Sequence, residues 1–108
     1  MARRTELLKG TLDLLILKTL ELEPRHGISV ADRIQQITRG TFTVKAGSLF
    51  PALHRLEQDG FIAGAWGESA EGHRVKTYRL TAAGRRQLAV EQRQWNRIVL
   101  AVGQVLES

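Results

Sequence analysis

Hydrogen-bonding and basic side chains would share one side of the segment Ala46–Gly60 if that segment formed a helix. Leu49, Leu53 and Leu56 recur at i, i+4 and i+7, which predicts an apolar side that packs inward. The opposite arc carries Ser48, Pro51, His54, Arg55 and Gln58. Arginine and glutamine side chains can hydrogen-bond to base edges in a DNA major groove, and serine and backbone N–H groups suit phosphate. The pattern therefore indicates a helix whose outer side is able to read nucleic acid.

Two neighbouring residues extend this candidate surface. Lys45 directly precedes the helix and is a candidate phosphate ligand, whereas Phe50 can make only apolar contacts with sugar or a thymine methyl group. For Arg55, a surface ion pair with Asp59 at i+4 is the alternative to a base contact.

Three residues predict the limits of the helix. Ser48 is expected to cap the first turn, and Pro51 is tolerated early in a helix, where N–H groups lack intrahelical partners. Gly60 suits a left-handed stop.

The net charge of +5 is unevenly distributed. Residues 1–71 carry nine Lys or Arg and nine Asp or Glu, whereas residues 72–97 carry seven against one. Local basic clusters favour phosphate binding because neutralising phosphates releases counterions. His73, Arg74 and Lys76 are the candidates in this region. The alternatives are a solvated helix face and basic residues that keep an edge strand soluble.

Several classes of function have no support in the sequence. The chain has no cysteine, so it has no disulfide, no Cys-x-x-Cys pair and no thiolate metal site. The histidines His26, His54 and His73 lack ligand spacing, and no glycine-rich phosphate loop or nucleophile motif is present. No apolar run approaches the roughly 18 residues of a membrane span, and no signal peptide is apparent. We expect no catalytic residue, metal, cofactor or membrane, and a cytoplasmic location.

Helical segments precede the reading helix. Residues 6–22 predict a first helix whose apolar stripe is so wide that it must be covered on two sides. Ser29–Ile37 predicts a short second helix capped by Ser29, and Thr38–Lys45 predicts a loop or a very short strand.

A hairpin and a final helix follow. Phe61–Trp66 and Val75–Leu80 predict two antiparallel strands, joined by a long polar loop that is a plausible flexible tip. Thr81 is expected to cap the last helix, along which apolar residues form a narrow seam at Leu88, Trp95, Val99, Val102 and Leu106. This seam predicts packing on a partner subunit; the alternative is a monomer whose last helix folds back on its own domain.

These elements predict a single domain, 1–108, that is mostly α with a small antiparallel β-hairpin. Their order suggests a winged helix-turn-helix over residues 5–80 and a C-terminal dimerisation helix over residues 81–108.

Four blocks of the chain resemble the PadR-like transcriptional regulators. They are Leu8–Leu17, His26–Gly27, Gly47–Glu57 and Tyr78–Thr81, in the family's order. The resemblance implies a winged helix-turn-helix, a homodimer built through the first and last helices, and repression at pseudo-palindromic promoter sites. This chain is similar to the short members, which have a single C-terminal helix.

The chain departs from the family pattern at three places. Phe50 stands where tyrosine is usual, so a hydroxyl that can bind phosphate is missing. Ile28–Ser29 replaces a tyrosine–glycine pair, and Thr77–Tyr78 replaces paired tyrosines near the wing.

The resemblance also implies an effector site. In some short members, a tryptophan on the last helix flanks a pore between the subunits that takes flat hydrophobic compounds. Trp95 matches that position, and the residues expected at the effector site or dimer interface with it are Leu8, Leu12, Ile98, Val99 and Val102. An interface anchor without a ligand is the alternative for Trp95. A winged-helix module that binds protein without binding DNA is the alternative for the whole chain.

Overall fold

The computed structural model describes residues 9–108, which form four helices and three strands. In chain order these are α1 (Lys9–Leu22), β1 (Arg25–His26), α2 (Gly27–Ile37), α3 (Ala46–Gln58), β2 (Ile62–Glu68), β3 (Arg74–Leu80) and α4 (Ala82–Leu106). The strands form one antiparallel sheet in the order β1-β3-β2. The predicted mostly helical fold with a hairpin is confirmed, and β1 is an additional strand, too short for its sequence pattern to reveal.

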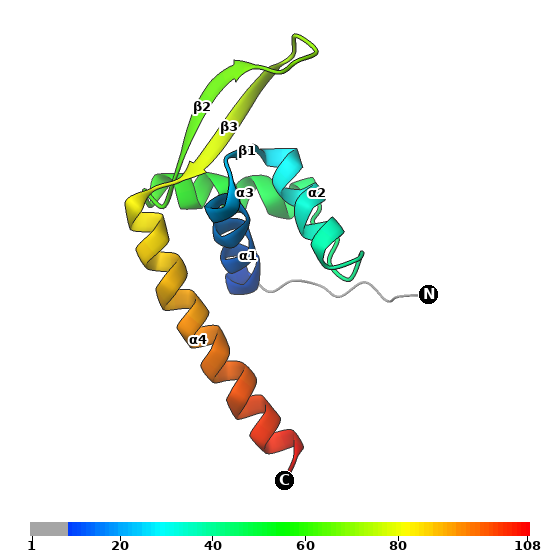
Figure 1. Cartoon of the computed structure of the whole chain (residues 1–108), viewed down its shortest axis with the longest axis vertical. Coiled ribbons are helices and arrows are strands. Elements are labelled where there is room, and N and C mark those ends of the chain that lie inside the picture. Colours follow the sequence, from blue (N-terminus) through cyan, green and yellow to red (C-terminus); the bar gives the residue numbers. More distant parts are fainter. Residues whose placement is uncertain (1–8) are drawn as a thin grey trace.

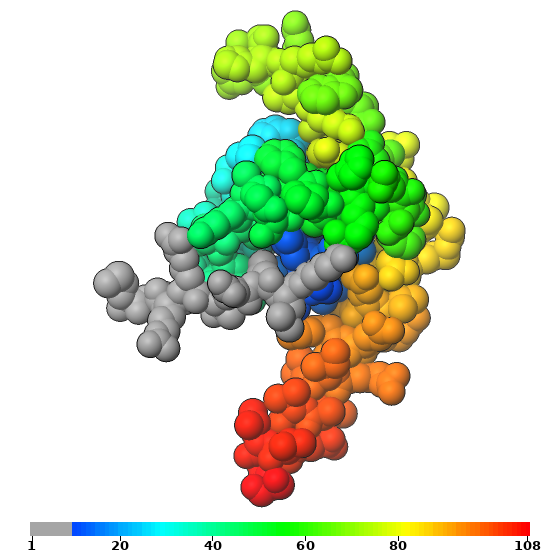
Figure 2. Space-filling view, turned by 180° about the vertical axis from the view of Figure 1, so that it is seen from behind, coloured from blue at the N-terminus to red at the C-terminus, as the bar shows by residue number. Residues whose placement is uncertain are grey.

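The hairpin and α4 project in opposite directions from a body formed by α1, α2 and α3 (Figure 1). The molecule is elongated as a result, with extents of 56 × 37 × 21 Å. In the view from behind, α3 crosses the surface of the body between the hairpin and α4 (Figure 2). The helix expected to read DNA thus lies on an open face beside the hairpin.

The hydrophobic core lies around α1, which contacts α2, α3, β3 and α4. These contacts explain its wide apolar stripe, because different sides of α1 pack against different elements. The most completely buried side chains are Ile16, Leu17, Val30, Leu49, Leu53 and Ile62. The predicted start of α1 at Glu6 lies outside the described residues.

Helix α2 begins two residues before the predicted start, and Ser29 is not its cap. His26 is the N-cap residue, and its Nδ1 accepts a hydrogen bond from the Ser29 backbone N–H at 3.3 Å. His26 is held in an extended conformation because it pairs with Thr77 of β3. The helix therefore begins directly where the strand ends.

Helix α3 begins at Ala46, the first residue of the predicted segment. Lys45 is its N-cap residue, and the Lys45 carbonyl accepts hydrogen bonds from the N–H groups of Ser48 and Leu49. The prediction that Ser48 caps the helix is wrong, since the cap has no side-chain hydrogen bond. Pro51 lies inside the helix, on its exposed side. The left-handed stop at Gly60 is confirmed by its φ of 79°.

The junction between the sheet and α4 follows the prediction. Thr81 caps α4, because its Oγ1 accepts a hydrogen bond from the Gly84 N–H at 3.0 Å and donates one to the Gly60 carbonyl at 2.6 Å. Gly84 makes a close approach possible here, since a Cβ at this position would lie 2.0 Å from the Phe61 carbonyl oxygen. The direction in which α4 leaves the body is thus set at its first turn.

Candidate nucleic-acid interface

The exposed arc of α3 carries most of the predicted reading residues. Leu49, Ala52, Leu53 and Leu56 are buried beneath the helix. The exposed side chains of the arc are Ser48, Phe50, Pro51, His54 and Gln58, and Lys45 is exposed just before it. His54 and Gln58 lie one turn apart, so two hydrogen-bonding groups follow each other along the outer face.

Phe50 lies at the edge of this arc and has contacts of its own. Its side chain is 46% exposed, and its ring lies beside Gly27 at the start of α2. A Cβ on Gly27 would lie 3.2 Å from the Phe50 Cε1 atom. Phe50 therefore packs partly on α2 and presents only apolar surface to a ligand.

Arg55 points toward α1 rather than along the outer face of α3. Its Nη2 donates a hydrogen bond to Asp13 Oδ1 and forms an ion pair with that carboxylate. The two side chains are 30% and 15% exposed. The alternative prediction of an ion pair between Arg55 and Asp59 is wrong, because Arg55 lies on the flank of α3 that faces α1. No sequence spacing could have indicated Asp13, which is 42 residues away.

A groove with a volume of about 340 Å³ lies on this flank of α3. It is lined by Leu12, Asp13, Gly47, Ser48, Pro51, Ala52 and Arg55. Ser48 thus lines the same groove as the paired side chains of Arg55 and Asp13.

The hairpin is longer and its tip shorter than the sequence predicted. Strand β2 continues to Glu68, which pairs with Arg74 at the start of β3. The tip is hydrogen-bonded, because the Ser69 N–H donates to the His73 carbonyl at 2.7 Å and the His73 N–H donates to Ser69 Oγ at 3.1 Å. His73 and Arg74 are exposed at this end of the hairpin.

Lys76 is tied to the reading helix. Its Nζ forms an ion pair with Glu57 Oε1 of α3 at 2.7 Å. The hydrogen bond with Glu57 raises the pKa of the Lys76 ammonium above its ordinary value, although burial opposes the rise. The predicted sharing of one strand face by Arg74 and Lys76 is confirmed, since both cations lie over the Trp66 ring of β2.

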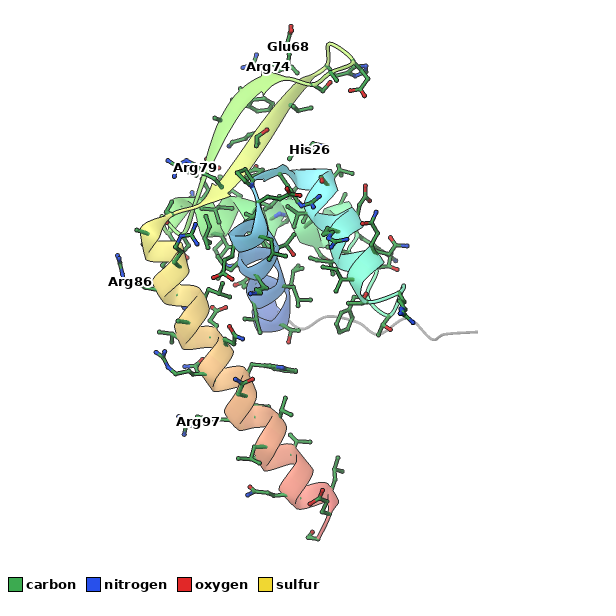
Figure 3. The ribbon with its side chains drawn as sticks, viewed as in Figure 1. His26, Glu68, Arg74, Arg79, Arg86 and Arg97 are labelled. Atoms are coloured by element: carbon green, nitrogen blue, oxygen red, sulfur yellow. The ribbon has the colours of Figure 1, made fainter. Side chains whose placement is uncertain are left out.

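Other basic residues of the C-terminal region lie elsewhere. Figure 3 shows Arg74 on the outer part of the hairpin near Glu68, and Arg79 at its base. In the same view Arg86 and Arg97 extend from the side of α4 opposite α1. The basic charge that follows residue 72 is therefore divided between the hairpin and the outer side of α4.

A second groove, also about 340 Å³, lies between α1 and α4. Trp95 and Ile98 line it as expected, together with Gly10, Thr11, Leu14, Glu91 and Gln94, which the sequence did not single out. Burial raises the pKa of the Glu91 carboxyl above its ordinary value. Its Oε2 atom is buried and has no hydrogen-bond partner among the described residues.

Leu12 is not among the described residues that line this groove. Leu12 is 5% exposed and belongs to the core, so it offers little surface to a ligand or a second subunit. Leu8 lies outside the described residues. Val99 and Val102 are exposed further along α4.

The described residues offer neither a metal site nor a membrane span. Residues 9–108 contain no cluster of His, Asp and Glu that could hold a metal ion. Within the same range, no helix combines the length and apolar character that a membrane span requires.

Comparisons with known proteins agree with this geometry. The sequence model of the transcriptional regulator PadR-like family matches residues 16–90. The chain is 37% identical over 59 residues to transcriptional regulator Rv3488 of Mycobacterium tuberculosis. The matched residues cover 55% of this chain and 54% of that protein.

Solved structures show the same fold. A PadR family transcriptional regulator from Eggerthella lenta is 31% identical, with a TM-score of 0.81 over 93% of this chain and 85% of that one. A PadR family transcription regulator from Clostridium difficile is 30% identical, with a TM-score of 0.77 over 88% and 97%.

Proposed function

Because this chain belongs to the PadR-like family of transcriptional regulators, we propose that it represses a nearby promoter by binding a pseudo-palindromic operator as a homodimer. Membership makes it a DNA-binding regulator and not an enzyme. The observation that carries the proposal is the exposed arc of α3 beside a projecting hairpin that bears basic residues. Such a regulator acts where the DNA is, so we place the protein in the cytoplasm.

In the proposed complex, α3 enters the major groove and its outermost side chains read base edges. His54 and Gln58 are the base-reading residues, because both are exposed and neither side chain is hydrogen-bonded to another of residues 9–108. Arg55 orients α3 through Asp13. Lys45 and Ser48 hold phosphate, and Phe50 and Pro51 supply apolar contacts with sugar or a thymine methyl group.

The hairpin supplies further backbone contacts. His73 and Arg74 lie at its far end, where they can reach a phosphate or the adjacent minor groove. Lys76 adds positive charge at the base of this surface while it stays paired with Glu57.

A homodimer explains the exposed apolar residues of α4. Trp95, Ile98, Val99 and Val102 are all exposed, although large apolar side chains gathered on one helix are usually covered. The distal part of α4 extends away from the body (Figure 1), which supports a partner subunit over the alternative in which α4 folds back on its own domain. A second copy that covers this surface would also place two α3 helices on one duplex, as a pseudo-palindromic operator requires.

The groove between α1 and α4 is the proposed effector site. Trp95 is 42% exposed there and provides a flat apolar wall suited to a planar hydrophobic compound. Binding between subunits would change their relative orientation and hence the spacing of the two α3 helices.

A mobility-shift titration tests DNA recognition. The probe is a duplex from upstream of the protein's own gene, and a random duplex of equal length is the competitor, at two salt concentrations. We expect His54→Ala and Gln58→Ala to reduce the preference for the upstream duplex by about 1–3 kcal/mol each. Gln92→Ala, on the exposed side of α4, is the matched control. If the unaltered protein binds neither duplex at either salt concentration, the proposal fails and a protein-binding module remains.

Tryptophan fluorescence tests the effector site. A Trp66→Phe variant leaves Trp95 as the only tryptophan, so quenching by a planar hydrophobic dye reports on the groove directly. We expect saturable quenching, and we expect Trp95→Ala to lower the affinity for the dye in an equilibrium dialysis assay. Equal affinity with and without Trp95 would leave this residue as an interface anchor only.

A further inference from the structure

Aromatic and cationic side chains alternate along one face of the β2–β3 hairpin. Tyr78, Lys76 and Arg74 follow one another on this face of β3, and Trp66 lies opposite Lys76 on β2. Tyr78 is buried in the core, whereas Arg74 is exposed at the far end. These four residues, which we call the hairpin ladder, lead from the core to the outer part of the hairpin.

The members of the ladder contact one another. The Lys76 Nζ atom lies 5.3 Å from the centre of the Tyr78 ring and 6.0 Å from that of Trp66. The Arg74 guanidinium lies 4.8 Å from the centre of the Trp66 ring. Cations within about 6 Å of a ring centre are attracted to its face. Trp66 therefore holds the guanidinium of Arg74, although the indole itself is 60% exposed.

The ladder is joined to the reading helix at Glu57. The ion pair between Lys76 and Glu57 crosses over Gly64 of β2, where a Cβ would lie 2.4 Å from the Lys76 Cε atom and 3.1 Å from Glu57 Oε2. A Cβ at this position would therefore require the Lys76 side chain to shift. The ion pair thus connects the hairpin to α3 above a position that has no side chain.

The outer hairpin needs such support because it has no third strand. Strand β1 pairs with β3 only at Tyr78 and Thr77. Beyond that point the hairpin is a two-stranded ribbon, and an isolated two-stranded ribbon is at best marginally stable. The contacts of Lys76, Trp66 and Arg74 are the packing that this ribbon has on its ladder face.

We propose that Trp66 and Glu57 are positioning residues for DNA binding, which fix Arg74 relative to α3 so that both contact the same duplex. Arg74 contacts a phosphate or the minor groove next to the half-site, and the exposed edge of Trp66 packs on deoxyribose. Lys76 is the link between the two and not a free phosphate ligand. This inference rests on the proposed function, since it assumes that the hairpin touches DNA.

The salt dependence of binding tests the role of Trp66. With a random 30-base-pair duplex, Arg74→Ala should weaken binding several-fold and reduce the salt slope by about one unit. Trp66→Ala should do the same although it removes no charge, because Arg74 loses its support. Trp66→Phe keeps a ring face and should restore most of the affinity. An unchanged affinity and slope in Trp66→Ala would overturn the inference.

A double-mutant cycle separates positioning from general damage to the fold. If Trp66 acts through Arg74, the double variant should bind about as well as Arg74→Ala alone, whereas independent contributions would add. Thermal melting of each variant identifies any loss of folding, and size-exclusion chromatography identifies any change of assembly. Additive losses would overturn the inference, and so would a Trp66→Ala variant that loses self-association but binds DNA normally.

Two glycines of β2 provide a matched pair of variants that test the ion pair between Lys76 and Glu57. Gly64→Ala should displace Lys76 from Glu57 and weaken DNA binding, as Glu57→Gln should. Gly67→Ala is the control, since a Cβ there would meet nothing within 4 Å. Equal binding by the two glycine variants would show that the link has no role. Failure of the unaltered chain to bind any duplex would instead refute the proposed function.

Discussion

At the scale of single residues, ion pairs with carboxylates determine which basic side chains are available to bind DNA. The sequence offers Arg55 only Asp59 as an ion-pair partner and offers Lys76 none, yet each is paired with a carboxylate of another element. His54, Gln58 and Arg74 keep exposed polar groups without such a pair among the described residues. Fewer basic side chains are therefore free to contact DNA than the number of Lys and Arg residues in the sequence suggests.

Asp13→Asn should destabilise the fold by about 1–2 kcal/mol, because it removes the carboxylate that pairs with the partly buried Arg55. Asp59→Asn should change stability by less than about 0.5 kcal/mol, as is usual for surface substitutions. Chemical denaturation of the two variants is the measurement. A loss in Asp59→Asn as large as that in Asp13→Asn would contradict the assignment of the ion pair.

Glu91→Gln should stabilise the protein at neutral pH and lose this advantage in acid. Burial raises the pKa of the Glu91 carboxyl above 4.5, and the charge of Asp13 adds to the rise, while a hydrogen bond from Gln87 and the charge of Arg55 oppose it. The folded protein then binds this proton more tightly than the unfolded chain does.

The contribution of this carboxyl to stability consequently falls as pH rises from 4.5 to the higher folded-state pKa. Denaturation curves between pH 4 and 7 measure the effect. A stability gain in Glu91→Gln that is independent of pH would show that ionisation of this carboxyl is not responsible.

At the scale of elements, short-range contacts set where each helix begins and in which direction it runs. His26 is the N-cap residue of α2, because β1 keeps its backbone extended. Thr81 is the N-cap residue of α4, and its hydroxyl also donates a hydrogen bond to the Gly60 carbonyl just after α3. The reading helix, the hairpin and α4 therefore meet within a few residues, and a change at this junction affects all three.

Gly84→Ala should destabilise the protein by about 1–3 kcal/mol, because the new Cβ would lie 2.0 Å from the backbone carbonyl oxygen of Phe61. Gly103→Ala in the same helix should be neutral or stabilising, since a Cβ there meets nothing within 4 Å and alanine favours helix. Thermal unfolding of both variants is the measurement. Comparable stability of the two would mean that α4 does not need this close approach.

At the scale of the whole molecule, the projecting α4 supports the proposed homodimer because its apolar side chains are exposed. The distal part of this helix extends beyond the body with apolar side chains exposed, among them Val99, Val102 and Leu106. The proposed homodimer would cover them and bring two reading surfaces together, so oligomeric state and operator affinity should change in parallel.

Val102→Asp should convert the dimer to a monomer and greatly weaken operator binding, because it buries an unpaired charge in the α4 interface. Gln104→Asp adds the same charge on the other side of α4 and is the control. Light scattering after size-exclusion chromatography and a mobility shift measure the two effects. If Val102→Asp stays dimeric, the α4 seam is not the interface.

Much of the fold follows from the sequence by itself. Leucine spacing predicted the inward side of α3, alternation predicted the hairpin, and the Thr81 and Gly60 signals predicted helix limits that the structure confirms. These features are local, because periodicity and capping depend on residues within one or two turns of each other. The four motif blocks also identified the family.

Only the tertiary structure decided which side chains face each other across elements. The pairing of Arg55 with Asp13, the pairing of Lys76 with Glu57, and the stacking of Arg74 on Trp66 join residues on different elements. Sequence spacing carries no information about such contacts, because they depend on how helices and strands are oriented in space. Local pattern therefore determined the elements of this protein, and their packing determined which charges remain free to bind DNA.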